Sequence, residues 1–328
     1  MNYKNYFFAL LFGFSVYATQ GQITEKPEGL ALLKDWFLST GEWHNDPQLY
    51  VRELGSGKDT VVMIHGGWGG EHGGLIQSVA SLKDQNRFIF YDQRGSLRSP
   101  FPDSLITFQH HINDLELLRK ELKLNKLTLV AHSMGTVLAS AYAQQYPERI
   151  KKLVLLAPAY LKNPIPKEDI ELQQQANEKH QAFMNRPEVQ EELAEYGLNR
   201  ENFSLSSKEW TATFRIKFAK RMLYNIHAWT ELTGGRALYK GHVFDLTANS
   251  YPKEGWDYFE VFKKGGYPVS IIVGDHDFLD MSNQLIKKWV TDNPRLNLKI
   301  IENAGHIIWL DQPELFETEL KNRLKAKN

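Results

Sequence analysis

The segment Ala131-His-Ser-Met-Gly135 holds a serine between small residues, a spacing that suits nucleophilic catalysis. A short apolar run over 127–132 precedes Ser133, and a helical pattern over 134–146 follows it. A strand that turns sharply into a helix exposes its serine hydroxyl and needs small residues two positions to either side, with alanine at 131 in place of the more common glycine. The turn also sets the serine at a helix N-terminus, where backbone N–H groups favour developing negative charge. We therefore expect Ser133 to be the nucleophile of a hydrolase.

A serine hydroxyl needs a general base, and the base needs an orienting carboxylate. Of the 11 histidines, His306 is the predicted base because it follows the last predicted strand. Asp277 is the predicted carboxylate because it stands beyond the turn that ends another strand, whereas Asp275 in the same loop is the alternative. The sequence contains no His-Glu-x-x-His metal signature, so neither a metal nor a cofactor is expected.

The glycine-rich segment His65-Gly-Gly-Trp-Gly-Gly70 follows another predicted strand. Acyl transfer needs N–H donors for an oxyanion, and the amides of Gly67 and Met134 are the predicted pair. No Lys-Ser or Lys-Thr follows these glycines, which argues against a phosphate-binding loop.

The elements that position these residues alternate along the chain. Helical patterns over 110–122 and 134–146 lie between short apolar, β-branched runs that predict strands. The runs cover 60–65, 87–92, 127–132, 152–157, 269–274 and 298–302. This order predicts an α/β fold with a mostly parallel central sheet flanked by helices, and chemistry at the carboxyl ends of its strands.

The alternation stops between about 160 and 266, where no convincing strand is found. Trp210, Phe214 and Phe218 recur there at helical spacing. We expect an inserted helical lid whose rings mostly pack together, with some of them lining a pocket above the site. The expected organisation is a core over 22–160, a lid over 161–265 and a second core segment over 266–328.

The charge balance and the N-terminal segment restrict partners and location. Lys plus Arg equals Asp plus Glu at 39 each, so no net field favours nucleic acid or an anionic membrane. Lys4, an apolar run over 6–18 and small residues after it predict a signal peptide over 1–21, with an uncleaved anchor or a core helix as the alternative. The run is shorter than the roughly 20 residues of a membrane span. We expect an exported protein, periplasmic or secreted, without a stable membrane span.

These motifs, together with Tyr91-Asp-Gln-Arg-Gly-Ser96, resemble the proline iminopeptidase family of α/β-hydrolases. The resemblance covers the catalytic core and leaves out the lid. The chain order Ser133, Asp277, His306 is the order expected of the triad in this fold. Asp92 and Arg94 are expected to pair and to brace the loop beside the oxyanion glycines.

The resemblance implies release of an N-terminal residue, often proline, from short peptides. Such enzymes hold the substrate α-ammonium with lid carboxylates, and Glu231, soon after Trp229, is the candidate in this sequence. Trp68 replaces a proline that is usual in the family, so we expect it to narrow the pocket as a substrate-binding residue.

Three hypotheses follow for the function. The first is a serine aminopeptidase of the proline iminopeptidase type that acts through an acyl-enzyme. The second is a carboxylesterase or lipid-ester hydrolase with the same triad, which would take a small ester. The third, a binding module on a hydrolase fold, is disfavoured because all three triad positions are filled.

Overall fold

The computed structural model describes residues 33–42, 46–201, 204–233, 239–291, 293 and 295–325. The expected signal peptide, residues 1–21, lies outside this part of the chain. Among the helices described, none combines the length and apolar character needed to cross a bilayer.

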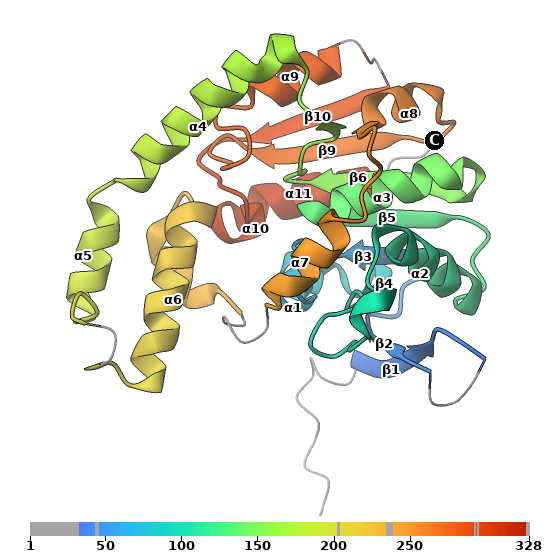
Figure 1. The fold of residues 1–328 in the computed structure, drawn as a ribbon, viewed down its shortest axis with the longest axis horizontal. Helices are drawn as coiled ribbons and strands as arrows, with labels where there is room; N and C mark the ends of the chain where they lie inside the picture. Colours follow the sequence, from blue (N-terminus) through green and yellow to red (C-terminus); the bar gives the residue numbers. More distant parts are fainter. Residues whose placement is uncertain are drawn as a thin grey trace, which may run out of the picture. The chain divides into compact units, whose positions relative to one another are not determined.

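The centre of the fold is an eight-stranded sheet in the order β1-β2-β4-β3-β5-β6-β9-β10 (Figure 1). The strand β2 runs antiparallel to its neighbours β1 and β4, whereas every pairing from β4 to β10 is parallel. Their bounds are β1 Leu33–Ser39, β2 Gln48–Leu54, β3 Asp59–Ile64, β4 Asn86–Tyr91, β5 Leu127–His132, β6 Ile150–Leu156, β9 Val269–Gly274 and β10 Leu296–Ile301. The six strands predicted from the apolar runs are confirmed.

Successive residues of each central strand face opposite cores. In β3, Val61 and Met63 join one buried cluster, whereas Val62 and Ile64 join the other. The first cluster lies under α1, α10 and α11, and the second under α2, α3, α8 and α9. Because both faces are covered, the strands are apolar throughout, which is why they appear in the sequence as continuous runs. These helices are α1 Gly73–Val79, α2 Phe108–Glu121, α3 Met134–Gln145, α8 Tyr258–Lys264, α9 Gln284–Thr291, α10 Ile308–Asp311 and α11 Pro313–Lys325.

The lid is inserted between β6 and β9. Its elements are β7 Lys162–Asn163, α4 Ile170–Met184, α5 Glu188–Glu195, α6 Ser207–Met222, the 3₁₀ helix η7 Ile226–Glu231, α7 Gly241–Ala248 and β8 Trp256–Asp257. The two-residue strands β7 and β8 pair and close the base of the insertion. In Figure 1 the arrowheads of β9 and β10 point to the side on which α4, α5 and α6 lie. The lid is therefore next to the sheet edge where chemistry is expected.

Two features depart from the sequence analysis. The strands β1 and β2 were not predicted, because they lie at the sheet edge and mix polar residues with apolar ones. The helix α8 falls within the expected lid range 161–265, yet its Tyr258, Phe259 and Phe262 are buried in the core cluster with α3 and α9. The structure therefore places α8 with the core.

Candidate active site

Ser133 occupies the turn between β5 and α3 with φ 52° and ψ −125°. A non-glycine residue in this region is strained, at a cost of about 1–3 kcal/mol, and such strain gathers at functional sites. The turn is held by the Ser133 N–H, which donates to the carbonyl of Leu156 at 3.0 Å. It is also crowded, because a Cβ built on Gly66 would lie 2.6 Å from the Ser133 Cβ. The residue is half-buried, so the strained turn presents the serine at the surface of the core.

His306 and Asp277 meet beside this turn. The Nδ1–H of His306 donates to the Asp277 Oδ2 at 2.9 Å, and both side chains are buried. The other Asp277 oxygen accepts from the Leu279 N–H at 2.9 Å, which fixes the carboxylate. The alternative carboxylate, Asp275, instead pairs with its neighbour His276 at 2.7 Å. The geometry therefore selects Asp277 as the partner of His306.

His132 joins the serine turn to the histidine loop. Its Nε2–H donates to the carbonyl of His306 at 3.0 Å, and the two rings lie 4.7 Å apart. Burial lowers the pKa of His132 to about 3, so the ring stays neutral. The sequence-based prediction of the base did not include His132. Its place next to Ser133 was the signal for a positioning role.

The two predicted oxyanion donors lie on either side of the serine turn. Gly67 has φ +65°, a conformation that favours glycine, and Met134 is the first residue of α3. Within the described residues neither amide N–H donates to a protein acceptor. Both donors are thus free to face an oxyanion.

Gln93 braces the glycine loop. Its side-chain amide donates to the His65 carbonyl at 2.8 Å, and its backbone N–H donates to the His65 Nε2 at 3.1 Å. The other ring nitrogen of His65 donates to the Gly66 carbonyl at 2.9 Å. His65 therefore supports the turn.

The predicted pairing of Asp92 with Arg94 is wrong. Arg94 forms a buried pair with Asp114 on α2, with a shortest contact of 2.5 Å. Asp92 accepts from the Arg98 guanidinium at 2.9 Å and from the His72 Nδ1–H at 2.6 Å. A turn at Gly95, φ +84°, lies between the two arginines, which have different partners.

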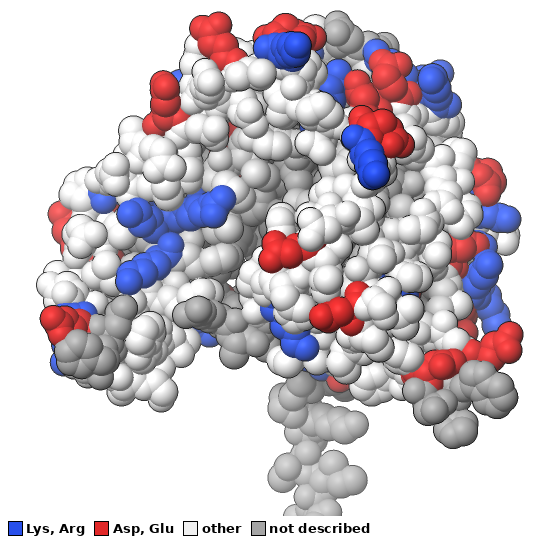
Figure 2. All heavy atoms as spheres, viewed as in Figure 1, with Lys and Arg blue, Asp and Glu red and all other residues white. Residues whose placement is uncertain are grey.

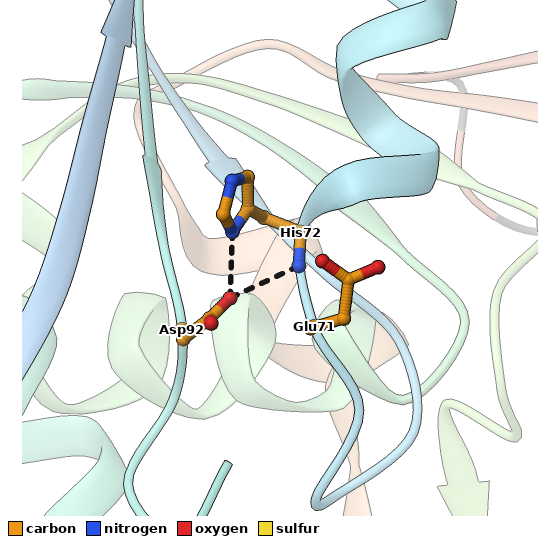
Figure 3. A group of neighbouring side chains, drawn as sticks. All are labelled: Glu71, His72 and Asp92. Carbon is orange, nitrogen blue, oxygen red and sulfur yellow. Dashed lines mark hydrogen bonds and ion pairs between the residues drawn. The ribbon is translucent and has the colours of Figure 1, made fainter. Parts of the chain in front are cut away.

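Glu71, His72 and Asp92 form a group whose ligand atoms lie within 4.8 Å of one another (Figure 3). Such a group could hold a divalent cation. However, the Arg98 guanidinium already donates to Glu71 at 3.1 Å and to Asp92 at 2.9 Å. A cation would have to displace it, so we assign the group to the support of the loop.

The lid is attached to the histidine loop at the end of α6. The carbonyl of Met222 accepts from the His306 N–H at 2.8 Å and from the Ile307 N–H at 3.3 Å. Asp311, at the end of α10, accepts from the Tyr224 N–H and from the Asn225 N–H, each at 2.9 Å. The end of α6 and the segment 306–311, which begins with His306, are therefore joined by four hydrogen bonds.

Trp68 does not line a pocket, contrary to the expectation from the sequence. Its side chain is fully buried, stacks on His111 at 4.8 Å and meets Phe108 edge-on. Its indole N–H donates to the Tyr251 hydroxyl at 2.5 Å. The Trp68 ring therefore packs the glycine loop against the core, and none of its own surface is left to contact a substrate.

Glu231, the predicted partner of a substrate ammonium, has an exposed side chain at the end of η7. Its carbonyl accepts from the Gln77 side chain at 2.9 Å, so this turn lies against α1. Another lid carboxylate, Asp245 on α7, was not predicted. Burial, and then the charge of Asp245, raises the pKa of Tyr239, whose ring would lie 3.6 Å from a Cβ on Gly67. Asp245 is exposed, on a helix whose start contacts the glycine loop through the Lys240 N–H, which donates to the Gly69 carbonyl at 3.0 Å.

A cavity of about 470 Å³ lies between the lid helices α4 and α6 and the loop that follows Asp277. Its polar lining comes from Asn177, His180 and Gln181 on α4 and from Arg221 on α6, and it includes no carboxylate. Its apolar lining includes Phe278, whose ring lies 4.7 Å from that of His306. Figure 2 shows this face hollowed, with Lys and Arg side chains over α6 on one side and Asp and Glu side chains over α7 on the other.

Comparisons with known proteins agree with this architecture. A family model described as the alpha/beta hydrolase fold matches residues 59–313. A proline iminopeptidase of Saccharolobus solfataricus is 30% identical over 276 residues, covering 81% of this chain and 84% of that protein. A proline iminopeptidase of Lactobacillus acidophilus is 26% identical over 83% of this chain and 92% of its own.

Solved structures show the same fold. A proline iminopeptidase-related protein of Thermus thermophilus superposes with a TM-score of 0.60 at 24% identity, covering 89% of this chain and 97% of its own. A carboxylesterase of Bacillus subtilis superposes with a TM-score of 0.58 at 16% identity, covering 92% of this chain and 96% of its own.

Proposed function

The chain belongs to the α/β-hydrolase family and is similar to proline iminopeptidases within it, and on that premise we propose that it is a serine hydrolase working through an acyl-enzyme. The observation that carries the proposal is the strained Ser133 turn beside the buried pair of His306 and Asp277. A nucleophile, a base and an orienting acid at one sheet edge are the groups that acyl transfer requires.

In this mechanism Ser133 attacks the substrate carbonyl while His306 takes the serine proton. Asp277 keeps the imidazole in the tautomer with Nδ1 protonated, which leaves Nε2 to act as the base. The amides of Gly67 and Met134 bind the oxyanion. His306 then gives the proton to the leaving group, and water releases the acyl group by the same steps in reverse.

The bond cleaved, in this proposal, is the first peptide bond of a short peptide. Two observations support an aminopeptidase. The chain is 30% identical to a proline iminopeptidase over 81% of its length, and Asp245 lies on the lid helix next to the oxyanion loop. An ammonium leaving water needs such a carboxylate. We assign this role to Asp245 ahead of Glu231, whose turn lies against α1.

Labelling and turnover together test the proposal. A fluorophosphonate probe should label the native protein and not Ser133→Ala, and N-terminal prolyl or alanyl amides should be hydrolysed. Asp245→Asn should raise KM for these amides by about 10- to 100-fold, as expected for a lost hydrogen bond to a charged group. Glu231→Gln is the matched control. Absence of amide turnover would contradict the proposed peptidase function, and equal labelling of the native protein and Ser133→Ala would contradict the proposed hydrolase mechanism.

The second candidate is an esterase, favoured by one observation. The cavity beside the triad carries Arg221 and no carboxylate, so an ammonium has no partner on that side. Hydrolysis of aryl esters without any amide turnover would support this candidate, whereas ester turnover alongside amide turnover would not.

We further propose that the protein is exported. Lys4 and the apolar run over 6–18 support a cleaved signal peptide. N-terminal sequencing of the protein from cell fractions tests this, and an intact Met1 in the cytoplasmic fraction would contradict it.

A further inference from the structure

The cavity under α4 and α6 has a lining that suits an anion. Arg221 has no ion pair in the described part of the chain, and its Cζ lies 4.2 Å above the ring of Phe278. A guanidinium presents several N–H donors in a planar fork that matches a carboxylate. Asn177 and Gln181 add neutral side-chain amides on the facing helix.

His180 adds a buried polar group without a partner. The residue is 5% exposed, lines the cavity, and neither of its ring nitrogens has a hydrogen-bond partner. A buried polar group without a partner costs about 1–3 kcal/mol. Turning the ring toward a bound anion would break no existing hydrogen bond and would satisfy one nitrogen. Burial, and then the charge of Arg221, lowers the pKa of His180, so the neutral ring can donate one N–H.

The position of the cavity shows which part of a substrate would enter it. Phe278 directly follows Asp277, and its ring lies 4.7 Å from the His306 ring and 4.2 Å from the Cζ of Arg221. The base of a serine hydrolase delivers its proton to the leaving group, so the leaving group must sit at His306. Because Phe278 lines the cavity and contacts His306, the cavity lies next to the base.

We propose that this cavity binds a carboxylate on the leaving group, with Arg221 as its main partner and His180 as a second donor. The inference rests on the proposed function and names its substrate class. In a dipeptide only the amide nitrogen and one Cα separate the scissile carbonyl from the free carboxylate. A short peptide would then place its ammonium toward Asp245 and its carboxylate toward Arg221.

Matched substrates with and without the carboxylate test the inference. The first pair is Pro-Gly or Ala-Gly against the same dipeptide amide. The second is the acetyl ester of 3-hydroxybenzoic acid against phenyl acetate. The native protein should prefer the carboxylate in kcat/KM by about 10- to 100-fold, the effect expected of hydrogen bonds to a charged group. The preference should appear mainly in KM.

Variants then locate the effect. Arg221→Met keeps an apolar stem on Phe278 and should remove most of the preference, whereas Arg221→Lys should keep part of it. Lys217→Met, on the same helix but outside the cavity lining, removes an equal charge and should retain the preference. An equal loss in Lys217→Met, or a retained preference in Arg221→Met, would overturn the inference.

The two proposals fail in different ways. Turnover of both substrate series without any preference for the carboxylate contradicts the anion site but is consistent with the proposed hydrolase. A preference confined to the esters, with no peptide turnover, keeps the anion site and removes the peptidase. Absence of turnover in both series removes both.

Discussion

Adding one methyl group at Gly66 should inactivate the enzyme while leaving it folded. A Cβ at this position would lie 2.6 Å from the Ser133 Cβ and 3.1 Å from the His132 carbonyl oxygen. Two carbon atoms pack best at about 3.5–4.0 Å, so the serine turn must move by about 1 Å. A displacement of that size at a reacting group costs on the order of 100-fold in rate. We expect Gly66→Ala to lose about that factor and about 1–3 kcal/mol of stability, as for other overpacked sites.

The assay is kcat/KM for phenyl acetate, together with the rate of fluorophosphonate labelling and thermal unfolding. Gly74→Ala is the matched control, because a Cβ on that glycine of α1 meets nothing within 4 Å. The alanine should be neutral or slightly stabilising in a helix. Near-native activity of Gly66→Ala would refute the reasoning. The reasoning would also be refuted if the loss of activity matched the fraction of unfolded protein, because the effect would then come from instability and not from displacement of the serine.

Three further predictions concern the triad, the core and acid stability. Asp277→Asn should lower kcat by roughly 10⁴-fold, because it favours the wrong tautomer of His306. Asp275→Asn should have a much smaller effect. If both variants lost ester hydrolysis to a similar extent, the assignment of Asp277 would be contradicted. Trp68→Phe breaks the hydrogen bond to Tyr251 and should lower the free energy of unfolding in urea by about 1–3 kcal/mol, while substrate preference stays the same. A changed substrate preference would show that Trp68 does line the substrate pocket. Although burial alone would raise it, hydrogen bonds from His72 and Arg98 hold the pKa of Asp92 at about 2, below its ordinary value of 3.8. The stability this carboxylate contributes, about 2 kcal/mol, is present above pH 3.8 and is lost as the pH falls through about 2, so Asp92→Asn should flatten that part of the unfolding profile.

The fold was largely predictable because its central strands are covered on both faces. The run over 269–274, for instance, is buried throughout and is too short for a helix. The strand β1 lacks this signal, since Lys34 and Asp35 face solvent, and β2 is interrupted by the polar residues Arg52 and Glu53. The predicted triad positions follow from motifs at the ends of strands, where the chain direction leaves few choices.

Contacts between separate loops and helices could not be predicted in this way. Spacing alone suggested that Asp92 pairs with Arg94, whereas Arg98, beyond the turn at Gly95, pairs with it instead. His180 and Arg221 lie on different lid helices, and neither belongs to a motif. Their convergence depends on how α4 and α6 pack, which a helical pattern does not specify.

The four hydrogen bonds between the end of α6 and the segment 306–311 have a mechanical consequence. A lid that swung away as a rigid body at Met222 would take the His306 backbone with it and disperse the reacting groups. Any lid opening would therefore have to move α4, α5 or α7 past a stationary junction. Remodelling the turn after Met222 to admit a new substrate would also move the base, whereas changes to α4 would not disturb these bonds. The part of the lid at the end of α6 is thus less free to change in sequence than α4.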